Sequence, residues 1–93
     1  MPLTREQSLP YMAEVLGWEI GINSKQISRD FKFDDFKTAM KFVNSVAELA
    51  EEEGHHPDIH ISYNKVRLIN STHAIGGLTE NDFILAAKIN RIK

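Results

Sequence analysis

The residues best suited to acid/base chemistry gather in the second half of the chain, at the ends of expected elements. His55 and His56 are adjacent, and His73 precedes a Gly-Gly turn. Glu51 stands four residues before His55, so on a helix the two side chains share one face. The dipole at a helix C-terminus favours a protonated imidazole, and Glu51 would add to that effect. These conditions are suited to general acid/base catalysis.

A structural role is the alternative for each of these residues. Histidines that follow a helix C-terminus often serve only as dipole partners and as donors to the last carbonyl groups. His60 falls on the polar face of its strand, where we expect it to face solvent. Asp82 stands three residues after Thr79, the spacing of a capping box at a helix start. Taken singly, none of these residues identifies an enzyme.

Metal and nucleotide chemistry have weaker support. Glu51, His55, His56 and His73 include metal-ligating types, but adjacent histidines do not readily reach one ion and the spacing matches no zinc pattern. The chain contains neither a GxGxxG motif nor a Gly-Lys-Ser/Thr motif. We therefore expect neither a metal site nor a nucleotide site.

Length and composition narrow the possible domain organisation and the possible classes of function. The 93 residues correspond to one domain, residues 1–93, whose small core makes a homo-oligomer the expected state. The absence of cysteine excludes a disulfide framework and thiol catalysis and agrees with the cytoplasm. The 11 Lys and Arg against 13 Asp and Glu argue against direct nucleic-acid binding. No apolar run approaches the roughly 18–20 residues that span a bilayer, so we expect no membrane segment.

The elements that must position the histidines follow from periodicity. Helical spacing and strand alternation succeed each other in the order α-β-β-α-β-β-α. We expect an α+β fold in which helices pack on one face of a four-stranded antiparallel sheet. The expected helices cover residues 4–16, 35–53 and 80–90, and the expected strands cover residues 18–22, 27–33, 59–63 and 66–72.

Local signals set the ends of these helices. Thr4, Asp34 or Asp35, and Thr79 are suited to N-caps, and Gly54 occupies a position typical of a left-handed C-terminal residue. We expect the long helix to bury one apolar stripe. The stripe contains Phe36, Ala39, Met40, Val43, Ala47 and Ala50.

The segment from Glu51 to Asp82 resembles the signature of the pterin-4a-carbinolamine dehydratases. The pattern is Glu51, three residues, His55-His56-Pro57, five residues, Tyr63, nine residues, His73, eight residues and Asp82. The inner segments 63–66, 71–73 and 77–79 also resemble the family, and so do the upstream segments 17–19 and 31–36. The resemblance therefore extends weakly over most of the chain.

The resemblance implies a hydro-lyase that acts on 4a-hydroxytetrahydrobiopterin, the pterin-4a-carbinolamine released by aromatic amino-acid hydroxylases. The products would be quinonoid dihydropterin and water, a step of tetrahydrobiopterin recycling. The resemblance also implies the α-β-β-α-β-β-α fold, a homodimer or homotetramer, and no metal or organic cofactor.

The resemblance further implies roles for individual residues. His55 and His73 would form the principal acid/base pair, and His56 would be a second catalytic imidazole that stabilises charge. Glu51 would bind the pterin or set the protonation of His55. Asp82 would orient His73 or its loop while it caps the last helix. Polar contacts to the pterin ring would come from Ser71 and Thr72.

Three positions depart from the family pattern. Many relatives have Trp in place of Ile59 and an acidic residue in place of Gly54, and some have Arg in place of Asn81. Relatives with those residues would have an aromatic wall and an extra carboxylate beside the pterin. Their replacement here implies a difference in substrate affinity or in side-chain preference.

A non-catalytic scaffold is the main alternative function. The same fold would then act as an assembly protein, similar to a transcriptional coactivator, because a fold alone does not determine function. The three histidines, Glu51 and Asp82 are all present, and a scaffold has no need to retain them together. This retention favours the enzyme.

Overall fold

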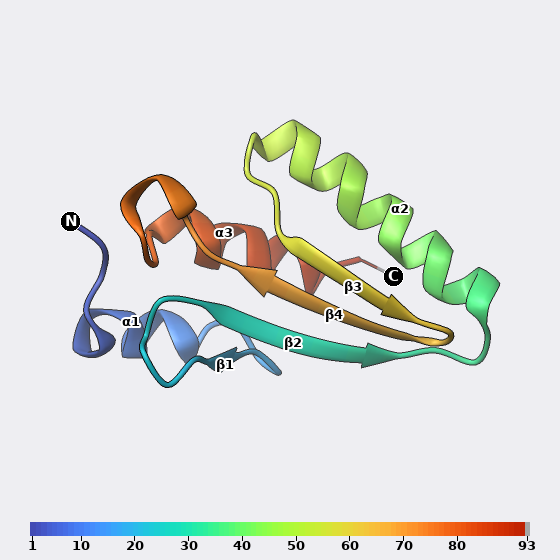
Figure 1. Cartoon of the computed structure of the whole chain (residues 1–93), viewed down its shortest axis with the longest axis horizontal. Coiled ribbons are helices and arrows are strands. Elements are labelled where there is room, and N and C mark those ends of the chain that lie inside the picture. The colour runs from blue at the N-terminus through green and yellow to red at the C-terminus, as the bar shows by residue number, and fades with distance from the viewer. Residues whose placement is uncertain (93) are drawn as a thin grey trace.

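A computed structural model describes residues 1–92 of the chain and confirms the predicted α+β class and the order of elements (Figure 1). It adds one short 3-10 helix, η1, between the last strand and the last helix. The elements are α1 (Arg5–Met12), β1 (Glu19–Ile20), β2 (Ile27–Lys32), α2 (Phe36–Glu53), β3 (Asp58–Ser62), β4 (Lys65–Asn70), η1 (His73–Ile75) and α3 (Glu80–Ile89).

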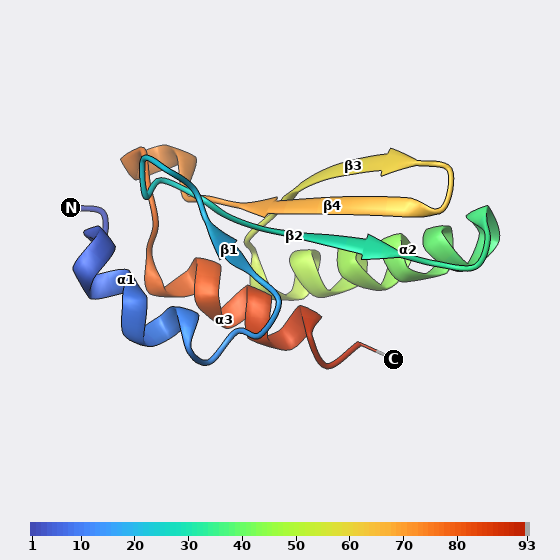
Figure 2. The same ribbon diagram turned by 90° about the horizontal axis from the view of Figure 1, so that it is seen from below.

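The four strands form one sheet in the order β1-β2-β4-β3, with every neighbouring pair antiparallel. Figure 2 shows α1, α2 and α3 on the same side of this sheet, as the sequence predicts. Phe31 lies opposite Val66, and Val66 lies opposite Ile61. Because side chains alternate across a strand, these residues share the helix-covered face.

The core lies between that face and the helices. Strands β2 and β4 contribute Ile27, Val66 and Leu68, and α3 contributes residues such as Leu85 and Ile89, all of which are at most 1% exposed. Every helix of residues 1–92 is too short or too polar to cross a membrane.

The long helix α2 begins and ends as predicted. The Asp35 side chain accepts a hydrogen bond from the Thr38 backbone N–H at 2.8 Å, so Asp35 rather than Asp34 is the N-cap. Gly54 ends the helix in the left-handed conformation, at φ +64°. The predicted stripe was partly wrong, because Phe36 is 50% exposed and Ala47 is also exposed. The buried residues follow a spacing of four, three and four: Ala39, Val43, Val46 and Ala50.

Several other predicted boundaries were wrong. Strand β1 covers only Glu19–Ile20 of the expected residues 18–22, and β4 ends at Asn70 rather than at Thr72. Helix α1 starts after its Thr4 cap but ends at Met12 rather than near Leu16, because Glu14 and Val15 bond to carbonyls only three residues back. Such bonds tighten the chain into turns. The second hairpin turns at Tyr63, which has φ +52°, so β3 ends at Ser62 and Tyr63 is not a strand residue.

Candidate active site

The three predicted histidines lie around one shallow pocket of about 280 Å³. The pocket is lined by the chain just after α2 and by the segment between β4 and η1. The β3–β4 hairpin separates these two segments in the sequence (Figure 1). Ser71 and Thr72, also predicted, lie on the same pocket. The lining consists of Gly54, His55, His56, Ser71, Thr72, His73 and Ala74.

His55 is anchored by a buried carboxylate. Its Nε2 atom lies 2.5 Å from Oδ1 of Asp82, and the two side chains are 16% and 0% exposed. We predicted that Asp82 orients His73 or its loop. In the structure the histidine that Asp82 binds is His55, because the first turn of α3 places Asp82 next to the end of α2. Asp82 does reach the loop of His73 through Thr72.

The other carboxylate oxygen of Asp82 is also occupied. Its Oδ2 atom accepts hydrogen bonds from the Thr72 hydroxyl and from the Thr79 backbone N–H, both at 2.9 Å. The Thr79 bond belongs to the predicted capping box, whose reciprocal pattern begins α3. One side chain therefore caps a helix, ties down the loop and binds an imidazole.

This arrangement assigns the tautomer of His55. An ionised carboxylate only accepts hydrogen bonds, so Nε2 of His55 bears the proton that faces Asp82. The neutral ring then has its lone pair on Nδ1, which has no hydrogen-bond partner among residues 1–92. The negative charge behind the ring stabilises the positive charge that the ring gains when Nδ1 takes a proton.

Glu51 binds the neighbouring histidine. Its Oε2 atom lies 2.5 Å from Nε2 of His56, and both side chains are well exposed, at 77% and 61%. The predicted Glu51–His55 pair was therefore wrong. The left-handed Gly54 ends the helix before His55 is reached, so the four-residue helical spacing no longer applies. His55 instead turns toward α3.

The loop that presents His73 is closed by its own backbone. The N–H of Thr72 donates to the carbonyl of Gly77 at 2.8 Å, and Gly76 adopts φ +69°. His73 begins η1 and is exposed. The hydroxyl of Ser71 donates to the carbonyl of Lys25 at 2.8 Å and joins this loop to the first hairpin.

Sequence reasoning missed Asn70, the last residue of β4. This side chain is fully buried, and its Nδ2 donates to the backbone carbonyl of Asp82 at 3.0 Å. Its Oδ1 has no hydrogen-bond partner in the described part of the chain, residues 1–92. The signal was present in the strand, because Val66, Leu68 and Asn70 alternate on the buried face and the third is polar. Asn70 ties the first turn of α3 to the sheet beside the histidine pocket.

The arrangement supports proton transfer at a partly exposed surface. One imidazole has an anchored orientation, and a second and a third lie on the same pocket. Among residues 1–92, no group of three or more His, Asp or Glu side chains is arranged to hold a metal ion.

Comparison with known sequences matches nearly the whole chain. The profile of the family described as pterin 4 alpha carbinolamine dehydratase matches residues 1–92. A protein of Nitrosospira multiformis, provisionally named as such a dehydratase, is 45% identical over 98% of this chain and 79% of its own length. The mitochondrial pterin-4-alpha-carbinolamine dehydratase 2 of Arabidopsis thaliana is 42% identical over 98% of this chain and 50% of its own.

Two solved structures have a similar fold. The transcriptional coactivator/pterin dehydratase of Brucella melitensis superposes with a TM-score of 0.90 at 36% identity, covering 97% of this chain and 96% of its own. A pterin dehydratase-like protein, identified as a RuBisCO assembly factor in the alpha-carboxysome, gives a TM-score of 0.69 at 20% identity, covering 83% and 89%. The second similarity extends to the fold alone.

Proposed function

Because this chain belongs to the pterin 4 alpha carbinolamine dehydratase family, we propose that it converts a 4a-hydroxytetrahydropterin to quinonoid dihydropterin and water. The observation that carries the proposal is the His55–Asp82 pair, which anchors one imidazole through Nε2 on a pocket shared with His56 and His73. The step would serve tetrahydrobiopterin recycling.

The reaction needs one proton removed and one supplied. The N5–H bond of the pterin breaks, its electron pair forms the N5–C4a double bond, and the C4a–O bond breaks as the oxygen takes a proton and leaves as water. His55 is the base, because its Nδ1 is unpartnered and Asp82 stabilises the resulting charge. His73 is the acid that protonates the leaving oxygen, and its exposure lets it regain a proton from solvent.

The remaining predicted residues support binding. Glu51 holds His56 at the rim, where the imidazole stabilises charge near the leaving oxygen. Ser71 and Thr72 have hydroxyls engaged within the protein, so their contribution is to hold the pocket wall toward the pterin ring. We propose a homodimer or homotetramer, which light scattering of the purified protein tests.

The test is the dehydration rate of 4a-hydroxytetrahydropterin, followed by ultraviolet absorbance with and without protein. His55→Ala and His73→Ala are each expected to lose about 100-fold or more of the catalysed rate. His60→Ala is the matched control, because His60 is an exposed histidine of β3 outside the pocket, and its rate should remain within about twofold.

Two results would overturn the proposal. If the folded wild type gave no acceleration, the histidine pocket would not be a dehydratase site, and the non-catalytic scaffold would replace it. If His55→Ala and His73→Ala kept the wild-type rate, the assignment of acid and base would be wrong even in a dehydratase.

A further inference from the structure

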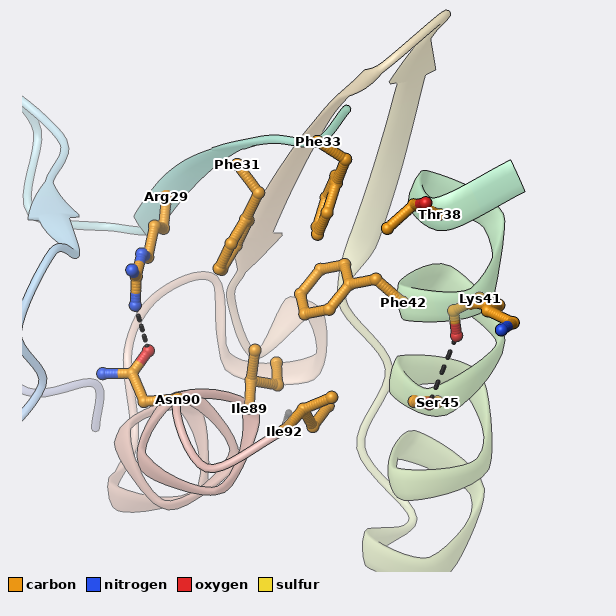
Figure 3. Close-up of a pocket in the computed structure, with 10 residues that line it drawn as sticks. All are labelled: Arg29, Phe31, Phe33, Thr38, Lys41, Phe42, Ser45, Ile89, Asn90 and Ile92. Atoms are coloured by element: carbon orange, nitrogen blue, oxygen red, sulfur yellow. Dashed lines mark hydrogen bonds between the residues drawn. The ribbon is translucent and has the colours of Figure 1, made fainter. Parts of the chain in front are cut away.

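A second and larger cavity, of about 640 Å³, lies between β2, the first half of α2 and the end of α3 (Figure 3). It has no lining residue in common with the histidine pocket. Its volume falls within the range of about 300–1,000 Å³ typical of small-molecule sites.

Three phenyl rings form its apolar wall. Phe31 lies on β2, Phe33 directly follows its last residue, and Phe42 meets both from α2 (Figure 3). The ring centroid of Phe42 lies 4.6 Å from that of Phe31 and 5.1 Å from that of Phe33. Ile89 and Ile92, on and just after α3, complete the apolar lining. Such a wall is suited to a flat aromatic ring, because aromatic pairs gain stability at centroid distances of about 4.5–7 Å.

A half-buried arginine marks one end of this wall. The guanidinium carbon of Arg29 lies 4.5 Å from the ring centroid of Phe31, and its Nη1 donates to Asn90 Oδ1 at 2.6 Å. Nη1 also donates to the carbonyl of Leu16. These bonds use one nitrogen and leave the other guanidinium donors without a protein acceptor among residues 1–92.

The charged residues that line the cavity are all cations. No lining residue is Asp or Glu, and none of the carboxylates of residues 1–92 lies within ion-pair distance of Arg29. Lys41 lies on the rim and turns its amine outward (Figure 3). Within residues 1–92, the cavity therefore presents a positive charge without a counter-ion, next to an aromatic surface.

We propose that this cavity binds an aromatic carboxylic acid, with its ring against the wall formed by the three phenyl side chains and its carboxylate on Arg29. Arginine is suited to this contact because its planar fork donates two parallel hydrogen bonds to a carboxylate. The site is separate from the proposed dehydration chemistry and goes beyond it.

The experiment compares 2-naphthylacetate with the uncharged 2-naphthaleneethanol, using titrations followed by the backbone amide signals of the isotope-labelled full chain. The acid is expected to bind about tenfold more tightly than the alcohol, because a hydrogen bond to a charged group adds to the shared ring contact. The largest shifts should map to Phe31, Phe42 and Ile92. Equal affinities, no binding, or shifts confined to other regions would overturn the proposal.

Substitution of Arg29 tests its role through the ratio of the affinity for the acid to the affinity for the alcohol. In Arg29→Met the preference for acid over alcohol is expected to fall to about one, and this ratio is insensitive to a general loosening of the cavity. Lys37→Met is the matched control, because Lys37 is an exposed cation on α2 that does not line the cavity, and its preference should stay near tenfold. An unchanged preference in Arg29→Met would refute the contact with Arg29.

Discussion

Replacing Asp82 with Asn tests the site most directly, because the structure dictates which way the new amide must face. Two donors, the Thr72 hydroxyl and the Thr79 backbone N–H, both point at Oδ2. Only the amide oxygen accepts hydrogen bonds, so it takes that position. The NH2 group is then placed where Oδ1 faced Nε2 of His55.

The new N–H donor reverses the tautomer of His55. Nε2 must become the acceptor, so the proton moves to Nδ1, the atom that we assign as the base. The neutral ring then presents a proton to the pterin in place of a lone pair, and the negative charge that stabilises the protonated ring is lost. General acid/base catalysis contributes about 10²–10⁴-fold, so we expect the rate of Asp82→Asn to fall by about 100-fold or more.

Two measurements separate this effect from unfolding. Nitrogen NMR of the imidazole rings should show the proton on Nε2 of His55 in the wild type and on Nδ1 in Asp82→Asn, while ultraviolet absorbance gives the dehydration rate. Glu51→Gln is the matched control, because its contact with His56 has the same 2.5 Å distance but is exposed to solvent. Exposed ion pairs contribute little, so we expect less than about a fivefold loss.

The reasoning would be refuted if folded Asp82→Asn kept its rate within about threefold of the wild type. It would also be refuted if the ring of His55 kept its proton on Nε2 in the variant. Equal losses in Asp82→Asn and Glu51→Gln would show that burial of the carboxylate does not matter.

Three further predictions concern stability and positioning. The hydrogen bond from Arg67 lowers the pKa of Asp30. This pair therefore stabilises the fold above about pH 4, and the contribution disappears as pH falls through the lowered pKa. Urea unfolding should show Asp30→Asn less stable than the wild type at pH 7 and equal to it at low pH, and a difference that stays constant with pH would contradict this. Gly54→Ala should lower the free energy of unfolding by about 1 kcal/mol, because φ is +64° while no atom lies within 4 Å of the added methyl group; an unchanged urea midpoint would exclude the backbone cost. Asn70→Leu should slow dehydration at least threefold, because the backbone of Asp82 loses its hydrogen bond to β4; a folded variant with the wild-type rate would disprove the positioning role.

The sequence was sufficient for features that depend on neighbours along the chain. The caps at Thr4 and Gly54 and the capping box of Thr79 with Asp82 were predictable, and the cap of α2 was narrowed to Asp34 or Asp35, because each involves groups within a few residues. Alternation and helical spacing likewise predicted the order of elements and the α+β class, because burial on one face imposes a period. The resemblance of the segment from Glu51 to Asp82 to a known signature indicated the family, which the comparisons confirm.

Partner choice was decided by the tertiary structure. Asp82 was predicted to orient His73 or its loop; it reaches the loop through Thr72, but the histidine that it binds is His55. Glu51 was predicted beside His55 but binds His56. Both depend on how the chain turns after Gly54 and on where α3 packs against α2, and neither is encoded in a local spacing. The same holds for the tether from Asn70 and for the cavity beside Arg29, which join strands and helices distant in sequence. Local hydrogen bonds determine where an element begins and ends, whereas packing of the whole chain determines which side chains meet.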